Sequence, residues 1–339
     1  MRRVRSGVAV LVGVVLVAGC GAGTRSGAGA SGGAAAGPIT LDSCGREVVF
    51  DSPPERVLAI GSEAPGLLVA AGAGDALTHY AGTLEAPFDD EVRPVVEGAE
   101  RVLEDSHDLS FETIIGTGVD VAIGTDISSS TDIDALADQL ARAGVQLVTV
   151  SNYCAGVNAA SVEGRSGFEL IYRDVEAYGR LFGTEQVAAE SIADMRQRVA
   201  AVEERTAGRT VRSAIPLYMT ANGGPLGAYG GQALVSEQMR VLGLDNVFDH
   251  VQKRYFEPNS EEVVASAPDL VFALYVPTGS SALETGDAVV AELRARPELA
   301  GLQVLADDRA LVPLNFFYTS ASPLAVDGLE LLADQVGGA

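Results

Sequence analysis

The stretch that decides the fold is LSFETIIGTGVDVAIG at residues 109–124. Ser110 is a residue type that favours the N-cap of a helix, and residues 119–123 form a run that is apolar except for Asp120 and ends at Gly124. A short helix followed by such a strand is typical of a parallel sheet with both faces covered by helices. Residues 109–124 therefore predict an α/β fold.

The same alternation extends on both sides of this stretch. Apolar runs that predict strands alternate with helical patterns that end at glycine. The strands are expected at 45–50, 56–60, 76–80 and 146–150, and the helices at 63–71 and 134–143. We therefore predict an N-terminal α/β lobe over residues 39–167.

Residues 168–207 show a helical pattern without a strand signal. Apolar residues between Ile171 and Leu181 lie three or four positions apart, which is the spacing of one helix face. A second stripe follows Gly183, and Thr184 is its candidate N-cap. This region is predicted to be a long helical connector.

Beyond residue 207 the alternation of strands and helices resumes. The expected strands are 211–219, 269–275 and 310–314, and the expected helices are 233–242, 260–267, 288–294 and 323–336. Residues 208–339 are therefore predicted to form a C-terminal α/β lobe. The chain is expected to contain two Rossmann-like lobes with parallel sheets, joined by the helical connector, with a ligand cleft between them.

The N-terminus has the pattern of an export signal. Arginines at positions 2, 3 and 5 precede an apolar run over 8–17 that is too short to span a membrane. Residues 17–20, Val-Ala-Gly-Cys, resemble a bacterial lipobox, so we predict a signal peptide over 1–19 and a lipidated (palmitate-bearing) Cys20. Residues 20–38 are nearly all small, chiefly Gly and Ala with some Ser and Thr, which is typical of a flexible tether. The protein is thus expected to be extracytoplasmic and anchored to the cell membrane.

The charge balance excludes some partners. The chain has 23 basic and 46 acidic residues, for a formal net charge of −23. This imbalance argues against binding to nucleic acid and against lying flat on an anionic membrane. It leaves room for a basic partner or a metal complex.

The cysteine count predicts a disulfide. With Cys20 committed to lipid, Cys44 and Cys154 are an even pair in an oxidising compartment. We predict that they are bonded to each other, with two free thiols as the alternative. In the chain-entropy account, a bridge closing a loop of about 100 residues stabilises the fold by roughly 4 to 5 kcal/mol.

No catalytic motif stands out. Lys253 is the only lysine, and its surroundings exclude a phosphate-binding loop. His79, His107 and His250 are isolated and lack the spacing of zinc ligands. We therefore expect no catalytic residue, no metal bound directly by side chains and no enzyme activity.

A second stretch, NSEEVVASAPDLVF at residues 259–272, matches residues 109–124 in its acidic helix start, short helix and strand that opens on Asp. Together with PERVLAI at 54–60, these stretches resemble the solute-binding proteins of ABC importers for iron–siderophore complexes, haem and cobalamin, the class III periplasmic binding proteins. The resemblance covers nearly the whole chain from about residue 45. It implies a monomer that captures a ligand and delivers it to a membrane permease.

The resemblance also assigns two docking residues. One Glu on each lobe contacts arginines of the permease in that family, and the matching positions are Glu112 and Glu261. The first stretch departs slightly, with Val119 where the family has Pro before Asp120. The alternative is structural, because Glu in the first turn of a helix interacts favourably with the helix dipole by about 0.3 to 1 kcal/mol.

The ligand is expected between the lobes, at the carboxyl ends of the strands. Tyrosines offer flat apolar faces and a hydroxyl, which suit large amphipathic chelates, although core packing is an equal alternative for each. Arg254, or Lys253 beside it, could pair with an anionic chelate, and at least one of the two is expected to be a solvated surface charge. The candidate residues are Ser62, Glu63, Tyr80, Thr125, Asp126, Asn152, Tyr153, Tyr218, Asn222, Tyr229, Arg254, Tyr255, Tyr275, Phe316, Phe317 and Tyr318.

A ferric siderophore is the expected ligand, and iron enters only as part of it. Cobalamin-binding members of the family carry an aromatic residue six positions before each docking Glu; here those positions hold Ser106 and Tyr255, so only the second fits. Three scattered histidines argue against a zinc or manganese receptor. Cobalamin, haem or another organic cofactor remain alternatives. Two alternatives come from other functional classes: a lipid-anchored extracytoplasmic hydrolase, and a receptor or accessory module without a transport role, each on a similar two-lobe fold.

Overall fold

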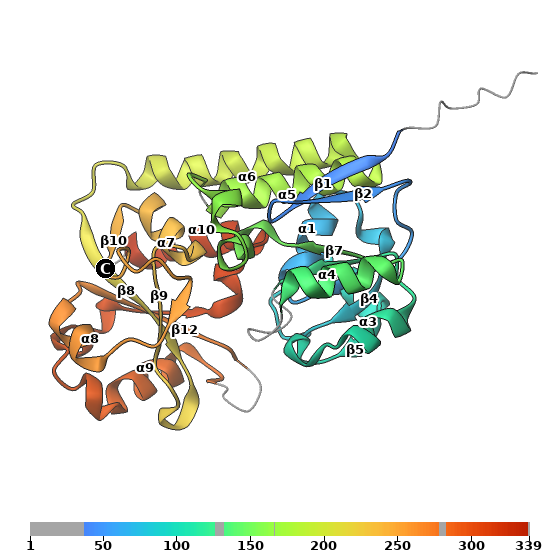
Figure 1. The fold of residues 1–339 in the computed structure, drawn as a ribbon. Coiled ribbons are helices and arrows are strands. Elements are labelled where there is room, and N and C mark those ends of the chain that lie inside the picture. Colours follow the sequence, from blue (N-terminus) through green and yellow to red (C-terminus); the bar gives the residue numbers. More distant parts are fainter. Residues whose placement is uncertain (1–36, 126–131, 166, 278–282, 338–339) are drawn as a thin grey trace, which may run out of the picture. The chain divides into compact units, whose positions relative to one another are not determined.

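A computed structural model describes residues 37–125, 132–165, 167–277 and 283–337 of the chain (Figure 1). The predicted signal peptide, Cys20 and almost all of the tether lie outside these residues, as does Asp126. Within the described ranges, no helix has both the length and the apolar character needed to cross a membrane.

The first lobe is built around a five-stranded parallel sheet with the order β5-β4-β3-β6-β7. Its strands are β3 (Val57–Ile60), β4 (Leu77–Ala81), β5 (Glu100–Leu103), β6 (Val121–Gly124) and β7 (Gln146–Thr149). Its helices are α1 (Glu63–Ala70), α2 (Val92–Gly98), α3 (Phe111–Thr117) and α4 (Ile133–Arg142). Sequence patterning misses α2, which contains a proline, and β5, which is half charged.

Both faces of this sheet are covered. Successive side chains of a strand point to opposite faces. In β3, Leu58 and Ile60 pack with residues of α3 and α4, whereas Val57 and Ala59 pack with residues of α1 and α2. All four residues of β3 are buried, which explains why this strand reads as a continuous apolar run.

The second lobe contains a six-stranded sheet of mixed direction. Strands β8 (Arg212–Met219), β12 (Leu270–Tyr275) and β13 (Leu311–Asn315) are parallel, as the sequence predicts, and the short strand β10 (Leu244–Asn246), which the sequence analysis does not include, pairs with β8 in the same direction. The short strands β9 (Gly227–Tyr229) and β11 (Tyr255–Phe256) add an antiparallel edge that the sequence analysis does not include. β9 runs antiparallel to β8 because only the short 220–226 connection joins them, and parallel neighbours need a longer crossover. The helices are α7 (Leu234–Val241), α8 (Ser260–Ser266), α9 (Gly286–Ala295) and α10 (Leu324–Gly337).

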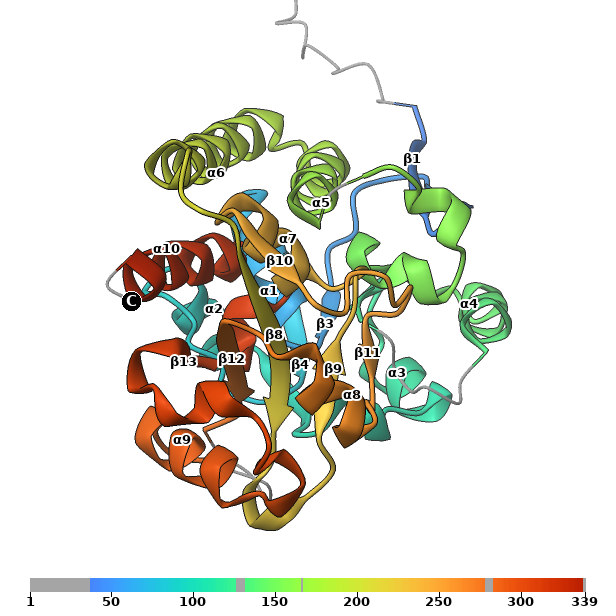
Figure 2. The same cartoon turned by 90° about the vertical axis from the view of Figure 1, so that its left-hand side faces the viewer.

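Two helices, α5 (Gly167–Phe182) and α6 (Glu185–Thr206), link the lobes in the chain. They lie side by side along the top of both lobes (Figures 1 and 2). The connector therefore folds back at Gly183, which has a left-handed φ of 70°. Thr184 does not cap α6 as expected, because its hydroxyl instead donates a hydrogen bond of 2.5 Å to the carbonyl of Ala71.

The connector is tied to the second lobe by an ion-pair network. The guanidinium of Arg198 on α6 donates hydrogen bonds to Asp327 at 2.5 Å and to Glu330 at 2.6 and 3.1 Å, both on α10. These partners raise the pKa of Arg198 and lower that of Glu330. A single apolar cluster also runs from the first lobe through α5 and α6 to α7 and α10. The two lobes therefore share a continuous core with the connector.

A disulfide joins Cys44 to Cys154, as the cysteine count predicts, across 110 residues of sequence. Cys44 lies in the turn between β1 (Ile39–Ser43) and β2 (Arg46–Phe50), an antiparallel hairpin of which the sequence analysis identifies only the second strand. Cys154 lies in η3 (Ser151–Gly156), the turn that follows β7. The bridge thus attaches the N-terminal hairpin to the loop that leaves the first sheet.

Replacing both cysteines (Cys44→Ser with Cys154→Ser) is expected to lower the free energy of unfolding by about 2–5 kcal/mol, because the unfolded chain regains the freedom of a long loop. Urea unfolding followed by circular dichroism measures the change. Reductant should produce the same loss in the wild-type protein and none in the double variant. Equal midpoints for the reduced and oxidised wild-type protein would contradict the expectation.

Candidate ligand-binding site

A cavity of about 560 Å³ lies between the two lobes. Its walls are built mainly from residues that follow the carboxyl ends of the parallel strands, which is where α/β proteins bind ligands. The first lobe contributes Gly61, Ser62, Glu63, Gly82, Thr83, Glu85, Glu104, Asp105, Ser106, His107, Thr125 and Tyr153. The second lobe contributes Arg254, Val276, Phe316 and Phe317.

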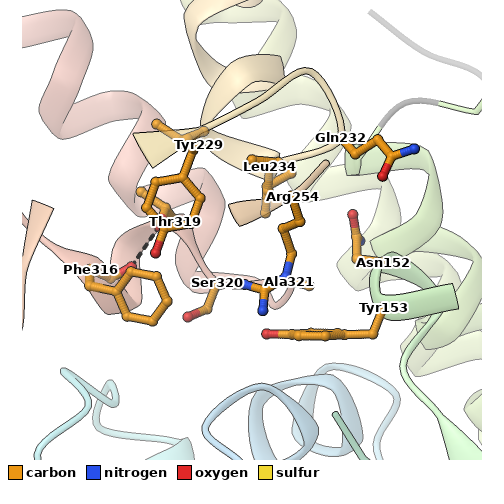
Figure 3. Close-up of a pocket in the computed structure, with 12 residues that line it drawn as sticks. Asn152, Tyr153, Tyr229, Gln232, Leu234, Arg254, Phe316, Thr319, Ser320 and Ala321 are labelled. Atoms are coloured by element: carbon orange, nitrogen blue, oxygen red, sulfur yellow. Dashed lines mark hydrogen bonds between the residues drawn. The ribbon is translucent and has the colours of Figure 1, made fainter. Parts of the chain in front are cut away.

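A smaller hollow of about 20 Å³ adjoins the cavity and shares Tyr153, Arg254 and Phe316 with it. A space of this size holds roughly one water molecule. Figure 3 shows the guanidinium of Arg254 above the ring of Tyr153 and beside Ser320. The remaining residues of the hollow are Asn152, Tyr229, Gln232, Ala233, Leu234, Val235, Thr319, Ser320 and Ala321.

Two contacts organise the polar end of the cavity. The Tyr153 hydroxyl donates a hydrogen bond of 2.6 Å to Oε1 of Glu63, and the Ser62 hydroxyl donates one of 3.2 Å to Oε2. These donors satisfy the carboxyl oxygens of Glu63, a residue that is only 4% exposed, because a buried polar group needs hydrogen-bond partners. From the opposite lobe, the guanidinium of Arg254 lies 4.8 Å from the centre of the Tyr153 ring. Tyr153 therefore contacts both lobes.

The backbone around Tyr153 is anchored on both sides. On one side, the amide and hydroxyl of Ser151 donate hydrogen bonds of 2.8 and 2.6 Å to the buried carboxylate of Asp174 on α5. On the other side, Cys154 is held by the disulfide, and Asn158 donates a hydrogen bond of 3.0 Å to the carbonyl of Cys44. Tyr153 thus sits in a rigid turn between two tertiary attachments.

Aromatic rings form the wall of the second lobe next to Arg254. Tyr218 meets Tyr255 and Phe316 edge to face, with ring centres 6.4 and 5.5 Å apart. Tyr229 stacks on Phe316 at 6.1 Å and meets Tyr255 at 5.7 Å. Burial raises the pKa of Tyr229 and Tyr218, so both stay neutral at physiological pH. The cluster offers an apolar surface bordered by hydroxyl groups.

A family model described as periplasmic binding protein matches residues 59–309, which is more than half of the chain. The chain belongs to the periplasmic binding proteins. Membership makes it a binding protein of ABC transport rather than an enzyme, as the sequence predicts. Among curated proteins, no sequence matches this periplasmic binding protein.

Solved structures agree with this assignment. An ABC-type Fe³⁺-hydroxamate transport protein from Saccharomonospora viridis is 31% identical, with a TM-score of 0.75, over 88% of this chain and 99% of that chain. A haem-binding protein of Vibrio cholerae (16% identity, TM-score 0.61, 82% and 97% covered) and a vitamin B12 binding protein of the same species (18%, 0.62, 84% and 97%) share the fold.

Nine of the sixteen residues proposed from the sequence line this binding protein's cavity or its adjoining hollow. The cavity includes Ser62, Glu63, Thr125, Tyr153, Arg254, Phe316 and Phe317, and the hollow adds Asn152 and Tyr229. Their role in binding stays a prediction. Asp126 lies outside the described residues.

The other candidates lie elsewhere. Tyr80 is a core residue, 1% exposed, whose hydroxyl donates a hydrogen bond to the Thr83 carbonyl. Asn222 occupies the turn after β8 with a left-handed φ of 59°, outside both spaces. Tyr218 and Tyr255 contact the rings of Tyr229 and Phe316 without lining either space. Tyr275 and Tyr318 pack against the second lobe's core instead.

Sequence reasoning missed the acidic rim of the cavity. Glu85, Glu104 and Asp105 lie in the loops after β4 and β5, and the sequence pattern shows no strand at β5. Recognition of β5 would have identified residues 104–107 as the end of a parallel strand. The carboxylate of Asp105 accepts hydrogen bonds from the amide and ring of His107, which lower its pKa. None of the described residues forms a group of three or more potential metal ligands.

The two predicted docking residues lie in corresponding places. Glu112 is in the first turn of α3 and Glu261 is in the first turn of α8, and both are exposed. Ser110 and Asn259 cap these helices through hydrogen bonds from Thr113 and Glu261 amides. Figure 2 shows both helices on the same side of the protein. A single partner surface could therefore contact both glutamates.

The buried carboxyl group of Asp174, which accepts the hydrogen bonds from Ser151, predicts a pH dependence of stability. Burial raises the pKa of Asp174 to about 7, despite the opposing effect of its hydrogen bonds from Ser151. The folded state therefore holds a proton that the unfolded chain releases, and stability should fall as the pH rises through about 7. We expect the decrease between pH 5 and 8 to be smaller in Asp174→Asn, whose side chain stays neutral.

Urea unfolding at several pH values measures this difference. Carboxylates with lowered pKa, such as those of Asp269 and Glu330, titrate below this range. If stability fell equally with pH in the two proteins, the raised pKa of Asp174 would not be the cause of the decrease.

Proposed function

We propose that this protein captures a ferric siderophore outside the cytoplasmic membrane and delivers it to an ABC permease while a lipid on Cys20 holds it at the membrane. The observation that carries the proposal is the cavity between the lobes, in which Arg254 lies over Tyr153 next to an aromatic wall. The 31% identity to an Fe³⁺-hydroxamate transport protein, over nearly its entire length, supports the ligand class.

The cavity suits a large chelate in size and chemistry. Its volume of about 560 Å³ falls within the usual range of small-molecule sites, roughly 300–1,000 Å³. A ferric chelate presents oxygen atoms that carry partial negative charge around the metal, together with apolar linkers. The guanidinium of Arg254 provides charged donors for the oxygens, and Phe316 and Phe317 provide apolar surface for the linkers.

The framework favours a modest closure of the lobes. The shared core and the Arg198 network hold α6 against the second lobe, and α5 carries Asp174, which holds the Tyr153 turn. Relative movement of the lobes would therefore change the contact between Arg254 and Tyr153 first. A ligand that bridges these two residues would stabilise the closed arrangement by binding to it preferentially.

Replacing Arg254 tests the proposal. A ferric trihydroxamate should quench the emission of the nine tyrosines, which no tryptophan obscures. Arg254→Ala should raise the dissociation constant by at least about tenfold, since a charged hydrogen bond contributes roughly 1.5–3 kcal/mol. Arg254→Lys should recover part of the affinity.

The matched control is Lys253→Ala, which removes the neighbouring exposed charge that does not line the cavity. Haem and cobalamin are titrated in the same assay. Tight binding of either one without binding of any ferric siderophore would reject the proposed ligand. Turnover of a test ester without binding of any of these ligands would favour the hydrolase alternative.

Docking to a permease is tested in cells. Glu112→Ala combined with Glu261→Ala should reduce uptake of radiolabelled ferric siderophore by tenfold or more, because both exposed carboxylates are proposed to contact permease arginines. The purified variant should bind its ligand with unchanged affinity. Glu204→Ala combined with Glu262→Ala removes two other exposed carboxylates and serves as the control. Equal uptake by the two double variants would exclude the docking role.

A further inference from the structure

We propose that the chelate bound in the cavity between the lobes carries a cationic group, which lies toward the acidic rim formed by Glu85, Glu104 and Asp105. This inference rests on the proposed function and specifies the charge of its ligand. It follows from the distribution of charge around the cavity.

The acidic rim belongs to the first lobe. Glu85 follows β4, and Glu104 and Asp105 follow β5; all three are exposed and line the cavity. Few basic side chains lie close to these three carboxylates. Arg101 lies 3.7 Å from Glu104, whose side chain remains 84% exposed, and His107 pairs with Asp105 at 2.8 Å. Among the described residues that line the cavity, Arg254 is the only arginine or lysine. The carboxylates therefore outnumber the cations.

The opposite end of the cavity has different chemistry; it lies at Tyr153, which follows β7 at the edge of the first sheet away from β5. There the cavity adjoins the small hollow in which the guanidinium of Arg254 lies next to Ser320. Ser320 is 3% exposed, and its hydroxyl has no hydrogen-bond partner among the described residues. An unsatisfied buried hydroxyl is costly, so this end is ready to bind a polar ligand atom. The Glu63 carboxylate is already bound by Tyr153 and Ser62. This end can bind the electron-rich oxygens of the chelate, as the proposed function requires.

These two ends make the cavity electrically asymmetric. A chelate whose metal centre lies at Arg254 directs its remaining atoms toward the acidic rim. A terminal ammonium there would be attracted by three carboxylates, and a terminal carboxylate would be repelled by them. The net charge of −23 on the whole chain acts in the same direction. Polyanionic chelates are therefore disfavoured relative to neutral or cationic ones.

The test compares three ferric complexes of one linear trihydroxamate that differ only at the terminal amine. The free amine gives a complex of charge +1, its N-acetyl derivative is neutral, and its N-succinyl derivative has charge −1. We expect affinity to fall in that order, by on the order of threefold to tenfold per unit of charge at low salt. The differences should shrink in about 0.3 M salt, where charges are screened within a few ångströms.

A triple variant of the acidic rim tests whether these carboxylates cause the difference in affinity among the three complexes. Glu85→Gln, Glu104→Gln and Asp105→Asn together should bring the three affinities to within about twofold of one another. The control triple Glu47→Gln, Glu204→Gln and Asp287→Asn makes the same change in net charge at exposed sites away from the cavity and should preserve the order. Thermal unfolding of both triples verifies that they are folded.

The outcomes separate this inference from the proposed function. Equal affinities for the three complexes, or strongest binding of the succinyl derivative, would overturn the inference and leave the proposed function standing. Loss of the order in the control triple would also overturn it, because the effect would then come from net charge alone. Binding of none of the three complexes, with haem or cobalamin bound instead, would overturn both.

Discussion

The attachment of the turn that carries Tyr153 is the constraint on which the rest of the site depends. Asp174 holds Ser151 from the connector side, and the disulfide holds Cys154 from the N-terminal hairpin. Tyr153 lies between these two attachments, and its position brings the hydroxyl to Glu63 and the ring face to Arg254. Because both attachments are tertiary, the geometry of the site is set by the packing of the first lobe against the connector.

The connector gives the two lobes a common support. A continuous apolar cluster and the Arg198 network bind α5 and α6 to both lobes. Close-packed interiors deform little, so the contacts that can change at low cost are those across the cavity. Arg254 over Tyr153 is such a contact, since it joins the lobes through side chains. A framework of this kind is suited to binding and release, with a small change in separation at the ligand.

Charge is distributed in a way that matches this arrangement. At the cavity, exposed acidic residues lie on the loops after β4 and β5 of the first lobe. Arg254, the arginine that lines the cavity, lies on the second lobe. Each lobe therefore presents a different chemistry to the ligand. The exposed glutamates at the starts of α3 and α8 lie outside the cavity, so the proposed docking surface is separate from the proposed ligand site.

The sequence by itself determined the two-lobe α/β architecture and the pairing of Cys44 with Cys154. Buried parallel strands such as β3 are apolar on both faces, and this pattern can be read from a short stretch of residues. It also identified seven of the sixteen residues that line the cavity, including Ser62, Tyr153 and Arg254.

Only the tertiary structure decided which aromatic residues line the cavity. Tyr80 is expected at the end of a strand and Tyr153 just after one, yet Tyr80 packs in the core and Tyr153 lines the cavity. The acidic rim was likewise invisible, because β5 is a short, half-charged strand that forms through pairing with β4. Strand pairing and side-chain packing depend on residues far apart in the chain, so they cannot be predicted from local patterns of polarity.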